Sequence, residues 1–137
     1  MRQGPARLRA RSEDGFSLVE LLVVIIIIGL LAAIAIPIFL NQRKKAVEAS
    51  LKSDLRTVAH QMETNFVDAK TYPTFTASNT PSIGGVTVKL SKSNTVASLA
   101  AGAATGTFCL QATNSSVGTT WYYDSDKGGL IGTTACS

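Results

Sequence analysis

The sequence has few of the residue types that catalytic and metal sites need. Its 137 residues include one histidine, His60, and two cysteines. One histidine is too few to form a zinc site, which needs three or four ligands. The sequence also shows no nucleophile and acid with which His60 would form a catalytic triad. His60 lies in a helical pattern among polar neighbours, and we expect it on the surface. We therefore do not expect the protein to be an enzyme.

Charge is also scarce, and it is unevenly placed. Charged residues make up 16% of the chain, and the formal net charge is +4. Four arginines, against two acids, stand in residues 1–15, so part of that positive charge belongs to the first segment alone. No long basic patch remains after it, and charge gives no argument for a nucleic-acid partner.

An uncharged apolar run extends from Leu21 to Leu40. A helix of about 20 residues spans about 30 Å, which matches the hydrocarbon core of a bilayer. Glu20 stands at the edge of this run, where a carboxylate within the membrane costs roughly 2.5–3.5 kcal/mol. A plain anchor needs no such acid. We interpret Glu20 as a residue that pairs with a positive charge carried by another copy of the chain.

The flanks of the apolar run leave two questions open. A basic start before an apolar segment also resembles a secretory signal, and Ala32–Ala35 is a possible ordinary cleavage site. Positive residues stand on both sides, since Arg43, Lys44 and Lys45 follow the run, so the positive-inside count is nearly balanced. Two cysteines in the C-terminal part suit an oxidising compartment, which favours a cytoplasmic N-terminus.

A second helical pattern follows the apolar run. Apolar residues recur every three or four positions and form one face, whose members are Val47, Leu51, Leu55, Val58, Met62 and Phe66. We expect this face to pack on a core, with a partner-binding helix as the alternative. The helix should end near Ala69, because Tyr72-Pro73 disfavours helical geometry. A helix from Phe16 to Asp68 would be about 80 Å long, so half of it must project into lipid or a bundle.

The remaining residues predict a small sheet. Residues 74–106 are rich in small polar residues and are expected to form a loop, broken by one strand at Val86–Leu90. Further strands are expected at Thr107–Thr113, Thr119–Tyr123 and Leu130–Thr133. Three or four antiparallel strands would then rest on the apolar helix face. The predicted fold class is α+β.

The heptapeptide Gly15-Phe16-Ser17-Leu18-Val19-Glu20-Leu21 resembles the processing site of type IV prepilins and secretion pseudopilins. The resemblance implies cleavage between Gly15 and Phe16, methylation of the new amine of Phe16, and an assembly role for Glu20. Gly29 and Pro37 stand where that family carries a glycine and a proline. By the same resemblance, the helix between them can unwind locally, with a static proline kink as the alternative.

The resemblance also implies an organisation and a set of partners. Residues 1–15 would be a cytoplasmic basic leader that is removed, 16–40 a transmembrane and filament-core helix, 41–70 an amphipathic helix, and 71–137 the head. The resemblance thus implies the type IV pilin fold. The implied partners are other copies of the chain in a helical filament, the prepilin peptidase and methyltransferase, the membrane, and an assembly platform with its ATPase. The chain would cross the cytoplasmic membrane once and later reach the cell surface in a pilus.

Cys109 and Cys136 resemble the disulfide-bounded region near the end of many type IV pilins. A bond between them would stabilise the fold by about 3.5 kcal/mol in the chain-entropy model. Two free buried thiols are the alternative.

Three further patterns near the C-terminus are weak. Asp124 and Asp126 precede two glycines, which faintly resembles a calcium loop, but the third oxygen ligand and the distal glutamate are missing. We expect a hairpin turn there and no cofactor, with calcium as the alternative because some secretion pseudopilins hold it near the C-terminus. Asn114 begins a glycosylation pattern, which often occurs by chance. Trp121, Tyr122 and Tyr123 should face alternate sides of a strand.

Taken together, the patterns predict a structural subunit of a type IV pilus, which would serve adhesion or motility. The first alternative is a pseudopilin of a type II secretion or DNA-uptake apparatus. The second, from another class, is a membrane-tethered binding domain.

Overall fold

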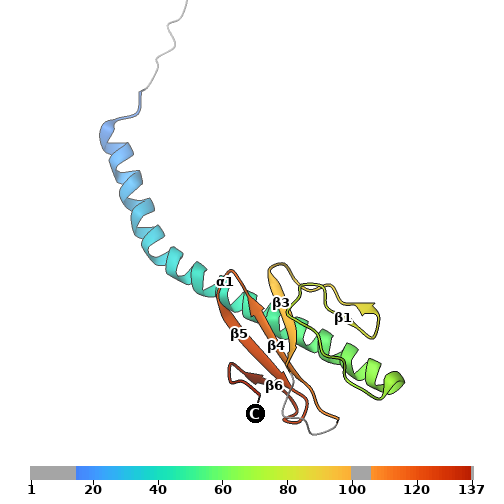
Figure 1. The fold of residues 1–137 in the computed structure, drawn as a ribbon. Coiled ribbons are helices and arrows are strands. Elements are labelled where there is room, and N and C mark those ends of the chain that lie inside the picture. The colour runs from blue at the N-terminus through green and yellow to red at the C-terminus, as the bar shows by residue number, and fades with distance from the viewer. Residues whose placement is uncertain (1–14, 100–105, 137) are drawn as a thin grey trace, which may run out of the picture. The chain divides into compact units, whose positions relative to one another are not determined.

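The computed structural model describes residues 15–99 and 106–136. Its longest element is a single helix of 52 residues (Figure 1). The helix, α1, extends from Leu18 to Ala69. Six strands follow: β1 (Ser82–Ile83), β2 (Val86–Thr87), β3 (Asn94–Leu99), β4 (Cys109–Asn114), β5 (Thr119–Asp124) and β6 (Gly129–Gly132). The chain divides into two compact units that meet between Phe39 and Leu40. Residues 1–14, most of the expected leader, lie outside the described residues.

In the first unit, the side chains of α1 are exposed on all sides. The large apolar residues between Leu18 and Phe39 have exposed fractions from 47% at Val23 to 81% at Leu18. This part of α1 is long and apolar enough to cross a membrane. A helix that is apolar around its whole circumference needs lipid or other apolar helices around it.

The far end of α1 lies where the sequence predicted it. The helix ends at Ala69, and Lys70 takes a left-handed conformation with a φ of 58°. The N–H of Lys70 donates to the carbonyl of Phe66 at 2.9 Å. This arrangement is a common way to end a helix, because it satisfies one of the last carbonyls.

In the second unit, four strands form one antiparallel sheet in the order β3-β4-β5-β6. β4 pairs with β3 along its full length, from Leu99↔Cys109 to Asn94↔Asn114. β1 and β2 form a separate two-stranded hairpin, whose turn is made by Gly84 and Gly85 with φ values of 58° and 82°. Figure 1 shows β3, β4 and β5 lying along the second half of α1. The predicted α+β fold, a long helix on a small antiparallel sheet, is confirmed.

The core of the second unit is built on the predicted helix face. Leu51, Leu55, Val58 and Met62 are completely buried, while Val47 and Phe66 at the two ends are half-buried. The sheet and the preceding loop supply the opposite side of the core through Ile83, Val88, Leu90, Val96, Phe108, Leu110 and Ala112. The apolar face is therefore a packing surface within the chain.

Two strand predictions were wrong. The predicted strand Val86–Leu90 keeps only its first two residues as β2. Val88 and Leu90 are buried, but their N–H groups donate to the carbonyls of Pro81 and Asn79 in a loop. β3 was not predicted at all, because its small and polar residues gave no strand signal. Pairing with β4 overrides that weak local preference.

Candidate functional site

The first turn of α1 is held by a reciprocal pair of hydrogen bonds. The backbone N–H of Ser17 donates to Oε2 of Glu20 at 2.9 Å, and the backbone N–H of Glu20 donates to Oγ of Ser17 at 3.2 Å. This is a capping box, which satisfies two of the donors that a helix start leaves free. This capping box was not predicted from the sequence, although the Ser-x-x-Glu spacing before an apolar run is its signal. The Glu20 carboxylate is therefore hydrogen-bonded within its own chain.

The same first turns form an open apolar hollow. It has a volume of about 430 Å³ and is lined by Phe16, Val19, Glu20, Val23 and Val24. Glu20 is the only acid among these five residues. Phe16 itself is 83% exposed.

The segment that precedes α1, residues 15–17, is accessible. Residues Gly15 to Ser17 are exposed and have no regular secondary structure. Apart from the glycine itself and its chain neighbours, no atom of the residues that the structure describes lies within 4 Å of the position that a Cβ of Gly15 would occupy. The peptide bond between Gly15 and Phe16 is thus not sequestered by the helix that follows it.

Gly29 and Pro37 both lie inside α1, which continues through them. A Cβ on Gly29 would meet open space, so packing within this chain does not require a glycine there. Local unwinding between the two residues stays a prediction.

Cys109 and Cys136 form a disulfide, with 6.2 Å between their Cα atoms. Cys109 is completely buried at the start of β4. Its neighbour Leu110 points into the core, so Cys109 lies on the opposite face of the sheet. The bond therefore fastens the last described residues to the sheet face that α1 does not cover.

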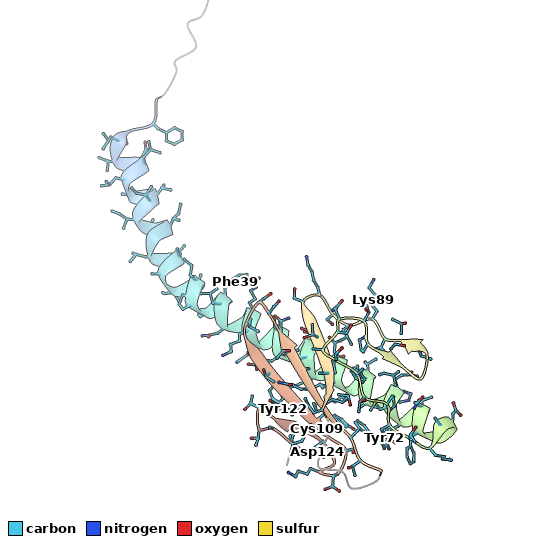
Figure 2. All side chains as sticks on the ribbon, viewed as in Figure 1. Phe39, Tyr72, Lys89, Cys109, Tyr122 and Asp124 are labelled. Atoms are coloured by element: carbon cyan, nitrogen blue, oxygen red, sulfur yellow. A yellow bond between two sulfur atoms is a disulfide. The ribbon has the colours of Figure 1, made fainter. Side chains whose placement is uncertain are left out.

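Asp124 and Asp126 belong to a hairpin turn between β5 and β6. Asp124 is buried, and its Oδ1 accepts the backbone N–H of Asp126 at 3.0 Å. Figure 2 shows Asp124 beside Cys109, its partner in the strand register. In residues 15–99 and 106–136, no group of three or more His, Cys, Asp or Glu side chains is placed to hold a metal. Calcium binding by Asp124 and Asp126, the alternative to the predicted hairpin turn without a cofactor, is not tested by these findings.

A buried polar network, which the sequence analysis missed, joins α1 to the sheet. Asp54 is 8% exposed, and its Oδ2 accepts hydrogen bonds from Asn94 Nδ2 at 2.6 Å and from the Ser91 N–H at 3.0 Å. Asn114 donates through Nδ2 to Asn94 Oδ1 at 2.6 Å and is 3% exposed. The amide of Asn114 is thus inaccessible to a glycosylating enzyme in the folded protein.

The three adjacent aromatic residues of β5 alternate between the two faces of the sheet, as predicted. Trp121 and Tyr123 pack against the core, whereas Tyr122 accepts a hydrogen bond from Gln111 Nε2 at 3.3 Å. Nζ of Lys52 lies 3.9 Å from the centre of the Trp121 ring, a cation–π contact. His60 is exposed on α1, as expected.

Comparison with known proteins places the N-terminal signal in a family. The family model for the prokaryotic N-terminal methylation motif matches residues 10–36. The chain is 33% identical over 119 residues to the type IV wide pilus major component PilA4 of Thermus thermophilus, which covers 86% of each chain. It is 31% identical over 67 residues to the type II secretion system core protein G of Aeromonas hydrophila, covering 49% of this chain and 47% of that protein.

A third relative, the type IV major pilin protein PilA of Myxococcus xanthus, is 36% identical over 61 residues, or 44% of this chain and 28% of that protein. The chain spans about half the length of the secretion-system relatives it matches. No solved structure gives a significant match. Three findings lead to one conclusion: the methylation motif, a long helix that is apolar and exposed in its first half and packs on an antiparallel sheet in its second, and the similarity to PilA4 along most of both chains. The chain belongs to the type IV pilin and type II secretion pseudopilin family.

Proposed function

We propose that this protein is the structural subunit of a type IV pilus and that it polymerises through the first half of α1. The observation that carries the proposal is the exposure of every large apolar side chain from Leu18 to Leu40. In a filament, these side chains would pack against their equivalents in other copies, and repeated contacts of this kind generate a helical assembly. The similarity to a pilus major component over 86% of both chains supports a pilin.

Processing would create the competent subunit. A prepilin peptidase would cut between Gly15 and Phe16, and its methyltransferase activity would methylate the Phe16 amine. The exposed, non-helical segment from Gly15 to Ser17 and the motif match over residues 10–36 support this step. Cleavage would also remove the four arginines of the leader.

Glu20 would then select the register between subunits. The freed amine of Phe16 is largely protonated near neutral pH and so carries a positive charge. The capping box uses Oε2 of Glu20, and within residues 15–99 and 106–136 Oε1 has no hydrogen-bond partner. Glu20 can therefore keep its own helix capped while Oε1 accepts the amine of a neighbour. A paired charge in apolar surroundings is tolerable and an unpaired one is costly, so the pair would penalise wrong registers more than it adds adhesion.

The proposed function also implies a path for the subunit from the cytoplasmic membrane to the cell surface. It would first cross the cytoplasmic membrane once, with its N-terminus in the cytoplasm, and then pass into a pilus at the cell surface through an assembly platform driven by an ATPase. Unwinding between Gly29 and Pro37 would accompany its exit from the bilayer. In this role the protein works as a structural component and catalyses no reaction.

A pseudopilin of a type II secretion system is the second candidate. It is favoured by the matches to core protein G of several bacteria, which cover about half of this chain. Shearing of cells separates the two functions, because a pilin is recovered in long fibres and a pseudopilin is not.

The test of the assembly mechanism compares two substitutions in the capping box. Glu20→Gln keeps the hydrogen-bonded cap, because glutamine serves equally at this position, but it removes the charge. Ser17→Ala removes the side chain that caps the helix and keeps the charge. We expect Glu20→Gln to abolish or greatly slow filament formation, seen by electron microscopy, while Ser17→Ala still assembles.

The amount of subunit in the membrane fraction serves as the control, because both variants should insert normally. Normal filaments from Glu20→Gln would remove the ionic role of Glu20. Loss of filaments in Ser17→Ala alone would assign the role of Glu20 to helix capping.

A further inference from the structure

Three consecutive cations follow the apolar part of α1. Arg43, Lys44 and Lys45 are exposed, and none has a hydrogen bond or ion pair with the residues that the structure describes. The nearest acid that follows them on the helix is Glu48, which is half-buried and makes no ion pair with Lys44 within the same described residues. The positive charge of this basic cluster, residues 43–45, is thus not neutralised by any ion pair within residues 15–99 and 106–136.

The basic cluster lies at a definite depth along the helix. α1 is continuous from Leu18 to Ala69, and its apolar run ends at Leu40. At 1.5 Å per residue, the three cations follow the end of the run by roughly 5–8 Å. Headgroups add about 5–7 Å on each side of a hydrocarbon core of about 30 Å. If the apolar run fills the core, the basic cluster lies among the headgroups.

The angular spread of the basic cluster indicates what surrounds it. Consecutive residues of a helix are about 100° apart, so residues 43–45 cover about 200° of the circumference. A single protein partner docks on one face of a helix, whereas headgroups surround it. Anionic phosphates also have the charge and the acceptor oxygens that arginine and lysine bind.

We propose that Arg43, Lys44 and Lys45 bind the headgroups of anionic phospholipids at the outer surface of the cytoplasmic membrane. These contacts hold α1 at a fixed depth before assembly. The proposal rests on the membrane residence in the proposed function, and it requires no filament. After removal of the leader, this cluster is the one run of three adjacent cations left in the sequence.

The test measures which lipids gather around the protein. The purified protein is reconstituted in phosphatidylcholine vesicles that contain a trace of spin-labelled phosphatidylglycerol or spin-labelled phosphatidylcholine. Electron paramagnetic resonance then gives the fraction of each lipid that the protein restricts. We expect a preference of at least threefold for phosphatidylglycerol, which weakens when salt screens the charges.

Two variants sharpen this measurement. The combined substitution Arg43→Gln, Lys44→Gln and Lys45→Gln should bring the preference close to one. The matched control, Lys89→Gln with Lys92→Gln, neutralises two exposed lysines of the head and should leave the preference unchanged (Lys89 is labelled in Figure 2).

A wild-type protein with no lipid preference, or a triple variant that keeps it, would overturn the proposal. Loss of filaments in the triple variant with an unchanged lipid preference would assign the cluster to a neighbouring subunit, which also overturns it. Glu20→Gln should retain the lipid preference even where assembly fails, so failure of the assembly mechanism and failure of lipid binding are distinguishable.

Discussion

The two halves of α1 differ in where their apolar side chains find partners. Leu51, Leu55, Val58 and Met62 in the second half are completely buried against the sheet and its loop. The first half, from Leu18 to Leu40, is richer in apolar residues, and yet its large apolar side chains are all exposed in the part of the chain that the structure describes. Apolar content alone therefore does not define a core. A helix builds a core where polar residues cover its other side and an opposing sheet is available.

A single spectroscopic probe makes this comparison measurable. Trp121 is the only tryptophan of the chain, and it packs against the core of the head. Its fluorescence therefore reports unfolding of the head and not of the exposed helix. Each prediction below uses the full chain in detergent micelles.

The largest effect is expected from a cavity in the head. Leu55→Ala removes a completely buried side chain, and we expect a loss of about 4 kcal/mol in the free energy of unfolding, measured by denaturant and Trp121 fluorescence. The matched control is Leu31→Ala in the first half of α1, where the side chain is 64% exposed. It should leave the denaturation midpoint of the head unchanged. Equal effects of the two substitutions would show that the halves of α1 are one cooperative unit.

Removal of the disulfide is expected to cause the second largest loss in the free energy of unfolding. Cys109→Ser with Cys136→Ser opens a loop with a sequence separation of 27 residues, which should cost about 3.5 kcal/mol through the greater freedom of the unfolded chain. Denaturant titration of the oxidised protein and the double variant measures the difference. A change below about 1 kcal/mol would contradict the loop-closure explanation.

A smaller effect is expected at the buried carboxylate. Asp54→Asn keeps the size of the side chain but removes its charge and one of the two acceptor oxygens to which Asn94 and Ser91 donate. We expect a loss of about 2 kcal/mol, the usual cost of leaving buried groups unsatisfied. Asp68→Asn, at an exposed acid near the end of α1, should change stability by less than about 0.5 kcal/mol. Similar values for the two variants would contradict a role of the buried network in holding the sheet on the helix.

The smallest effect concerns alkaline pH. Partial burial of the phenol, together with its hydrogen bond to Glu63 and the charge of that carboxylate, raises the pKa of Tyr72 above its ordinary value. The folded state therefore favours the neutral phenol, so stability is fully present below the unfolded pKa of about 10 and falls as pH rises through the folded value. Tyr72→Phe should remove this part of the alkaline decline. Parallel stability curves for wild type and variant between pH 9 and 12 would show that Tyr72 does not contribute.

What the sequence predicted well is encoded within short segments. The apolar face of α1 and its end near Ala69 follow from helical spacing and from Tyr72-Pro73, which act locally. β4, β5 and β6 were each predicted to within two residues of their bounds, since turn residues and β-branched or aromatic residues marked them. The capping box of Ser17 and Glu20 was readable by the same local rules and was overlooked.

What the sequence did not predict depends on distant partners. β3 contains Asn94, Ala97 and Ser98, which have little preference for strands, and it forms because β4 and residue Ser78 pair with its two sides. An aspartate in an amphipathic helix is usually exposed. Asp54 is buried because its hydrogen-bond partners, Ser91 and Asn94, lie 37 and 40 positions further along the chain. No short window contains such a network, so only the folded structure reveals it.

The position of the disulfide also decides how the head would respond to pulling. A load applied beyond Cys136 passes through the sulfur bridge to the start of β4, an inner strand of the sheet. It thereby bypasses β6, the short strand at the edge, whose few hydrogen bonds would otherwise open first. Under an external pulling force, a subunit would thus carry the load through β4, which is paired on both sides. After reduction of the disulfide, the segment that follows β5 would be the first to detach from the sheet.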